Sequence, residues 1–210
     1  MDQSNNHFLY DPSSKDLQLF ENPDCWKITG SEAAEYVKEH VIRSLEDDVP
    51  PILDLFDKGA KHQGKGFFAM LRVIFPYLTW VGKLFDSKGS EANWVTKFLE
   101  CHIDQSYTKY GELLYEMYRH GLMHNHFPNS EWKDGKFYSW AITLDCSKHL
   151  QEKSYQIQYI DTKNQLTIMV IPISPHQLYQ DIHNALNNYA MQLEKGKWLN
   201  EFHEGFKSKR

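Results

Sequence analysis

The sequence predicts an α+β protein: a mainly helical bundle, then a β-hairpin or small antiparallel sheet, then a closing helix. Two observations predict this class. Apolar residues recur every three or four positions through most of residues 31–122, as in helices with one buried face. After Pro128 the pattern changes to short runs rich in aromatic and β-branched residues, separated by turn signals, which is typical of strands.

The same patterns divide the chain into three segments. Residues 1–30 form an N-terminal arm that is polar and aromatic without a sustained period. Residues 31–127 form the helical bundle, and residues 128–210 form the hairpin extension and closing helix, packed on the same domain. A length of 210 residues suits one globular domain.

The first helix is predicted to begin at a capping box. Thr29 is followed three residues later by Glu32, so each side chain can bond the backbone N–H of the other. The pair Pro50-Pro51 is expected to end this helix, because proline has no N–H to donate. Ile52–Lys58 is then expected to form a short separate helical turn.

The stretch Phe67–Phe85 is apolar enough to resemble a membrane span. Arg72, Pro76 and Lys83 interrupt it, however, so a buried core helix is expected and no membrane association. Pro76 should kink this helix or split it in two.

Two further helices precede Pro128. Ser90 is predicted to cap one of them. The other runs from about Asp104 to Leu122, and Leu114 lies on its apolar face.

The strand region contains clear turn and cap signals. Asp134-Gly135 marks a turn, residues 137–144 read as a strand, and residues 155–160 and 166–173 read as the two strands of a hairpin. Ser174 followed by Pro175 is a typical start for the closing helix. Aromatic residues of this region can stack on nucleobases, although strand aromatics more often fill a core; they are Trp132, Tyr138 and Trp140.

Composition limits the classes of function. The chain has 23 basic and 28 acidic residues, a formal net charge of −5, which argues against a generally basic nucleic-acid coat but leaves room for a local basic site. The three cysteines form no CxxC pair, so neither a disulfide framework nor a zinc knuckle is indicated. With no signal-peptide pattern at the first residues, a cytoplasmic location is expected.

The densest group of reactive side chains lies on the last turn of the helix that ends near Leu122 and on the residues directly after it. Arg119, His120, His124 and His126 lie within eight residues. Histidine titrates near neutral pH and can act as a general base or acid. The planar guanidinium of arginine can hold two phosphate oxygens. Together these side chains could bind a phosphate and transfer protons without a metal ion.

Arg119, His120 and His124 also match a family motif, an arginine directly followed by a polar residue and separated from a later histidine by four to six residues. Here the chain resembles the HEPN superfamily (higher eukaryotes and prokaryotes nucleotide-binding), over roughly residues 31–127. His126 satisfies the longer spacing. The resemblance implies a helical-bundle fold and an endoribonuclease that needs no cofactor, with Arg119, His120 and His124 as catalytic residues and His126 as a substrate-binding residue.

The resemblance also implies partners. One chain carries too few catalytic groups for the whole reaction, and HEPN-type enzymes pair two motifs across a dimer, so a homodimer with a shared cleft is expected. RNA or a nucleotide is the expected ligand. The toxin and antiviral defence systems in which such enzymes occur would add an antitoxin protein as a further partner.

Three other interpretations fit the same residues. A catalytically silent HEPN-like module would bind RNA or a nucleotide, or would dimerise, without cleaving. Arginine and histidines at the end of a helix can simply neutralise the negative end of its dipole. Alternatively, His120, His124 and His126 could together bind a metal ion.

Overall fold

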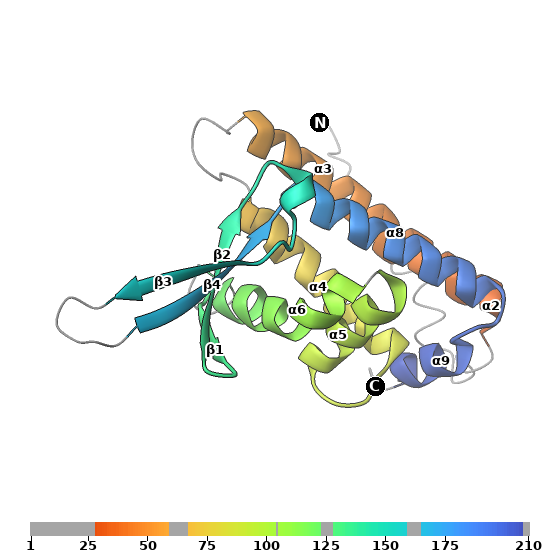
Figure 1. The fold of residues 1–210 in the computed structure, drawn as a ribbon. Helices are drawn as coiled ribbons and strands as arrows, with labels where there is room; N and C mark the ends of the chain where they lie inside the picture. Colours follow the sequence, from red (N-terminus) through yellow and green to blue (C-terminus); the bar gives the residue numbers. More distant parts are fainter. Residues whose placement is uncertain (1–27, 59–66, 104, 123–127, 159–164, 208–210) are drawn as a thin grey trace, which may run out of the picture.

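The computed structural model describes residues 28–58, 67–103, 105–122, 128–158 and 165–207 (Figure 1). Within these ranges a group of helices lies beside a four-stranded sheet, so the α+β class is confirmed. The predicted arm, residues 1–30, lies almost wholly outside the described residues.

The first helical rod is longer than predicted. It consists of α2 (Gly30–Val37), a π-helical turn η2 (Lys38–Ile42) and α3 (Arg43–Lys58), without a break between them. The capping box at its start is confirmed: the Thr29 hydroxyl accepts from the Glu32 amide, and the Glu32 carboxylate accepts from the Thr29 amide at 2.8 Å.

The prediction that Pro50-Pro51 ends this helix is wrong, because α3 continues through both prolines to Lys58. Because proline has no N–H, the carbonyl oxygens of Glu46 and Asp47, four residues earlier, receive no helical hydrogen bond. Both of those residues are exposed, so water can replace the lost bonds. Ile52–Lys58 is therefore the last part of α3 and not a separate turn.

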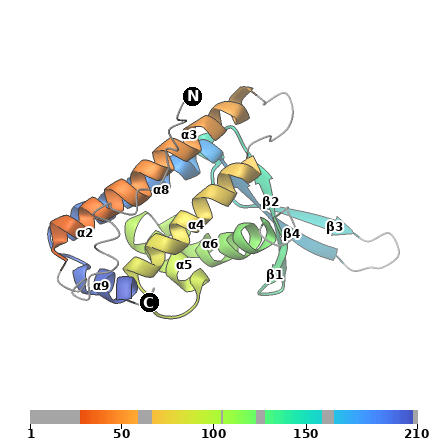
Figure 2. The ribbon, with the colours of Figure 1, turned by 180° about the vertical axis from the view of Figure 1, so that it is seen from behind.

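The apolar stretch forms the central helix α4 (Phe67–Phe85). By length and composition it is the one described helix that could cross a membrane, but it packs as a core helix against α3, α5 (Glu91–His102) and α9 (Leu199–Lys207). Figure 2 shows α4 between α3 and the helices α5 and α6. Pro76 does not split it, because the proline lies on the exposed side.

The predicted helix from about Asp104 to Leu122 appears as α6 (Gln105–Leu114), followed directly by a π-helical turn, η4 (Tyr115–His120). Helical backbone continues to Leu122. Ser90 caps the preceding helix α5, its side chain accepting from the Asn93 amide, as predicted.

The sheet has four strands: β1 (Glu131–Lys133), β2 (Lys136–Ile142), β3 (Lys153–Gln158) and β4 (Gln165–Ile173). Their spatial order is β1-β2-β4-β3. The β3–β4 hairpin is confirmed. So is the Asp134-Gly135 turn, in which both residues have positive φ angles of 49° and 72°, as tight hairpins require.

The prediction of an antiparallel sheet is wrong in one respect, because β2 and β4 run parallel and make the sheet mixed. A parallel pair needs a long connection. Here the connection contains the 3-10 helix η5 (Cys146–Lys148) and the edge strand β3. Nothing in the local pattern of either strand reveals which neighbour it will pair with.

The two faces of the sheet differ in burial. Tyr138 and Trp140 on β2 lie beside Met169 and Ile171 on β4 and pack toward the helices.

The closing helix α8 (Pro175–Glu194), capped by Ser174 as predicted, runs alongside α2 and α3 (Figure 1). The fit near Gly30 is close, since a Cβ atom there would lie 2.3 Å from the Leu193 carbonyl oxygen.

Candidate functional site

Arg119 lies on the π-helical turn η4, at the end of the long helix that begins with α6. Single π-helical turns inside α-helices are rare and occur frequently at functional sites. Successive residues of such a turn are spaced by a smaller angle than in an α-helix.

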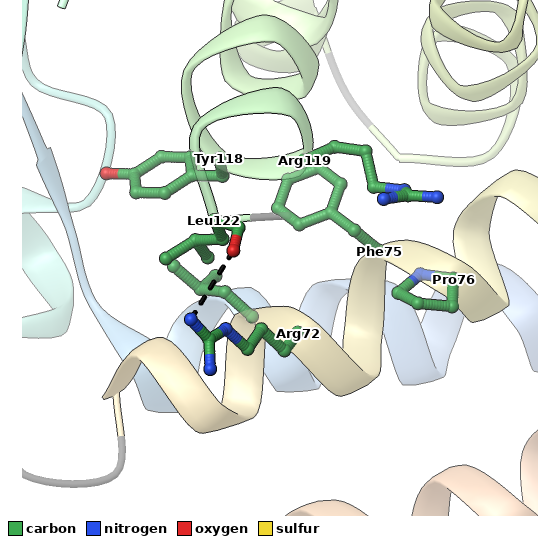
Figure 3. A pocket seen from close by; sticks show the side chains of 7 residues that line it. Arg72, Phe75, Pro76, Tyr118, Arg119 and Leu122 are labelled. Atoms are coloured by element: carbon green, nitrogen blue, oxygen red, sulfur yellow. Dashed lines mark hydrogen bonds between the residues drawn. The ribbon is translucent and has the colours of Figure 1, made fainter. Parts of the chain in front are cut away.

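Arg119 borders a small pocket between the end of this helix and α4 (Figure 3). The floor is apolar and aromatic, and Phe75 stacks on Tyr118 with 6.1 Å between ring centroids and an interplanar angle of 21°. The lining residues leave no room between them for a water molecule; they are Leu71, Arg72, Phe75, Pro76, Tyr118, Arg119 and Leu122. The pocket is therefore the base on which the arginines rest, and any ligand would lie above it.

Arg72 on α4 is the second cationic residue of this pocket, and the sequence analysis did not connect it with Arg119. Its Nη2 donates to the carbonyl oxygen of Leu122 at 3.4 Å. Arg72 thus stabilises the carboxyl end of the helix, the place where negative charge from the helix dipole collects. The signal that could have found it was the arginine in the middle of the apolar stretch Phe67–Phe85.

Arg119 makes no comparable hydrogen bond to the end of the helix. Its Nε is buried and has no hydrogen-bond partner, while the residue as a whole is half-buried. In Figure 3 its guanidinium extends over Phe75 and Pro76, on the opposite side of the pocket from that of Arg72. Among the described residues no carboxylate lines the pocket. A half-buried guanidinium without an acidic neighbour in its pocket is available for an anion such as a phosphate.

The tyrosines beside Arg119 are not acid–base groups at neutral pH. Burial raises the pKa of Tyr118 well above its ordinary value. Burial also raises the pKa of Tyr115, together with the hydrogen bond that its hydroxyl donates to the Glu91 carboxylate at 2.5 Å, and the nearby Arg119 acts in the opposite direction. Neither tyrosine is therefore a candidate for proton transfer at neutral pH.

Of the predicted histidines, His120 is the last residue of η4, and its side chain is not among the described parts of the structure. His124 and His126 lie outside the described residues. The structure therefore brings Arg119 together with Arg72 and leaves the arrangement of the histidines around it as a prediction. Among the described residues no group of three metal-ligating side chains occurs.

The structure reveals a second polar cluster that the sequence analysis missed. The Tyr107 hydroxyl donates to the Asp181 carboxylate at 3.0 Å and lies 2.9 Å from Nε2 of His149. Nδ1 of His149 accepts from the Ser174 amide at 2.9 Å, so the proton of the neutral ring is on Nε2. The cluster joins α6, the β2–β3 connection and α8, and its side chains are largely buried, which indicates a structural role.

His102, at the end of α5, is buried among aromatic rings and neither ring nitrogen has a hydrogen-bond partner. Its ring centroid lies 4.8 Å from that of Phe98 and 5.0 Å from that of Phe85. Burial, with a smaller contribution from Lys197, lowers the pKa of His102 to about 4. The ring is therefore neutral at physiological pH, as suits a histidine among the aromatic rings of the core.

Comparison with known proteins adds no relative: no family model, no curated protein and no solved structure matches this chain.

Proposed function

We propose that this protein is a metal-independent endoribonuclease of HEPN type, in which Arg119 binds the phosphate at the cleaved bond. One observation carries the proposal: Arg119 is half-buried, with an uncommitted Nε and no carboxylate in its pocket. This also argues against the simpler role of a dipole cap. Arg72, and not Arg119, donates to the carbonyl oxygen of Leu122 at the end of the helix.

The proposed reaction divides the chemistry between the arginine and the histidines. One imidazole takes the proton of the ribose 2′-hydroxyl, whose oxygen then attacks the phosphorus. Arg119 stabilises the negative charge that develops on the phosphate oxygens. A second, protonated imidazole gives its proton to the departing 5′-oxygen. The products are a 2′,3′-cyclic phosphate and a free 5′-hydroxyl, and His120, His124 and His126 are the candidate acid and base.

The proposal includes a homodimer, because each chain supplies only one Arg119 and one set of these histidines. Two copies related by a twofold axis would place two motifs in one cleft. Light scattering should then report about twice the chain mass of 24.8 kDa. A fully active monomer would contradict this part of the proposal.

The test is cleavage of single-stranded RNA in excess EDTA, with the cyclic phosphate end identified by mass spectrometry. Arg119→Ala, His124→Ala and His126→Ala are compared with the wild type. Arg43→Ala is the matched control, since Arg43 is an exposed helical arginine whose partner, Glu39, lies on the same surface. Arg119→Ala should abolish cleavage, and Arg43→Ala should leave it unchanged.

Three other outcomes would each point elsewhere. Cleavage that stops with EDTA and returns with zinc would indicate the three-histidine metal site. RNA binding without cleavage would indicate the catalytically silent module. If Arg119→Ala cleaves like the wild type, Arg119 has no catalytic part and the proposal fails.

A further inference from the structure

The outer face of the sheet, turned away from the core, carries one row of side chains that crosses all four strands. Trp132 on β1 lies opposite Phe137 on β2, which lies beside Ile168 on β4, which lies opposite Tyr155 on β3. Directly paired residues point to the same face of a sheet. We call these four residues the aromatic row.

The aromatic row is exposed at its two ends, Trp132 and Tyr155, and half-buried at Phe137 and Ile168 between them. Trp132 is 63% exposed and Tyr155 is 51% exposed, and the Trp132 and Phe137 rings contact each other with 5.3 Å between centroids. The residues that directly follow Phe137 and Ile168 along their strands, Tyr138 and Met169, are buried. The alternation shows that the row faces away from the helices, and Figure 1 shows the β3–β4 hairpin projecting away from them.

The charges on this face favour a polyanion. No strand residue that shares the face of the row is acidic, although the chain as a whole has a net charge of −5. Lys153 lies on the same face two residues before Tyr155 and forms no ion pair within the described ranges. Lys133 and Lys136 lie opposite each other on β1 and β2 and point to the other face, where Lys133 is paired with Glu112.

From these observations we propose that the aromatic row is a binding platform for single-stranded RNA, on which nucleobases stack while Lys153 attracts the phosphates. Stacking on aromatic rings beside positive charge is the usual way in which proteins hold single strands without reading their sequence. The row spans three inter-strand spacings, about 14 Å, enough for more than one base. This inference rests on the proposed RNA-directed function and assigns the substrate class as single-stranded.

The platform lies one sheet layer away from the candidate site. Trp140, on the inner face of β2, contacts Tyr118 with 6.4 Å between ring centroids, and Tyr118 directly precedes Arg119. An RNA chain bound on the outer face would therefore have to pass around the sheet to reach Arg119. The row would hold the substrate beside the reaction and take no part in the chemistry.

The test is fluorescence anisotropy with the full chain and a labelled 2′-O-methyl oligouridine, which has no free 2′-hydroxyl and cannot be cleaved by the proposed reaction. Trp132→Ala and Tyr155→Ala should each weaken binding by roughly five- to a hundredfold. Trp132→Phe should restore most of the affinity. Leu144→Ala is the matched control, because Leu144 is a 61% exposed apolar residue in the loop after β2, and it should bind like the wild type.

The proposal is overturned if the wild type does not bind the oligonucleotide, or if both alanine variants bind it as the wild type does. It is also overturned if these variants turn a dimer into a monomer without changing RNA affinity, since the row is then a protein interface. Cleavage is measured separately. A wild type that binds through the row but never cuts RNA refutes the ribonuclease alone, and one that cuts RNA with no effect of the row variants refutes the platform alone.

Discussion

The guanidinium of Arg72 donates to the carbonyl oxygen of Leu122, fifty residues later in the chain. This bond ties the middle of α4 to the end of the helix that carries Arg119. It leaves Arg119, on the preceding turn, as the cation in this pocket that is not needed to close the helix. The two arginines therefore differ in role: Arg72 holds the end of the helix, and Arg119 does not.

Arg72→Ala should reduce RNA cleavage without abolishing it, because it loosens the end of the helix but leaves Arg119 in place. Loss of the hydrogen bond and of the favourable charge at the helix end should lower the free energy of unfolding by about 1 kcal/mol. Arg43→Ala, the exposed control, should change it by less than about 0.5 kcal/mol. Urea denaturation and a cleavage assay check both effects. If Arg72→Ala loses as much activity as Arg119→Ala at unchanged stability, Arg72 binds substrate itself.

Leu114→Ala should destabilise the protein strongly. Leu114 is buried in the core on the helix that leads to Arg119. Truncating a buried leucine leaves a cavity and costs roughly 2–5 kcal/mol. Leu55→Ala is the matched control, because Leu55 is 62% exposed and should change stability by less than about 0.5 kcal/mol. Thermal melting of the two variants side by side measures the difference, and equal melting temperatures would show that Leu114 is not a core residue.

His102 should make the protein sensitive to acid. Because burial lowers the pKa of His102 to about 4, the unfolded chain, with its ordinary histidine pKa of about 6.5, binds the proton more readily. The resulting loss of stability begins as the pH falls below the unfolded value and is complete at the folded one. It amounts to about 3 kcal/mol between pH 6.5 and pH 4.

His102→Phe should remove this contribution, since phenylalanine occupies the aromatic surroundings and carries no proton. His176→Gln is the control, because His176 is a more exposed histidine paired with Asp57. Urea denaturation at several pH values gives the slope of the free energy of unfolding against pH for each variant. The same slope in His102→Phe as in the wild type would show that other groups cause the acid sensitivity.

Tyr107→Phe should lower the free energy of unfolding by more than the loss of an ordinary surface hydrogen bond does. The buried Tyr107 hydroxyl contacts both His149 and Asp181, so its removal takes one partner from each. The expected loss is about 1–3 kcal/mol. Tyr77→Phe removes an exposed bond of 2.9 Å to Asp48 and should cost less than about 1 kcal/mol. A denaturation midpoint for Tyr107→Phe equal to that of Tyr77→Phe would argue against a role for the cluster in stability.

The helices, caps and turn could be read from the sequence because they depend on neighbouring residues. The Thr29–Glu32 capping box, the Ser174 cap and the Asp134-Gly135 turn each need only side chains within a few positions. The path of α3 through Pro50 and Pro51 could not be read in this way. It depends on packing against distant helices, which outweighs the local cost of two prolines.

By itself the sequence determined the α+β class, the core faces of the helices and the proposal of Arg119 and its neighbouring histidines as a site. These follow from periodicity and from spacing along a single segment. The tertiary structure alone decided that β2 pairs in parallel with β4, that Arg72 reaches Leu122, and that Trp132, Phe137 and Tyr155 share one row. Each of these joins segments that are separate in the chain. Their pairing is set by the packing of the whole core, and no local pattern of residues encodes it.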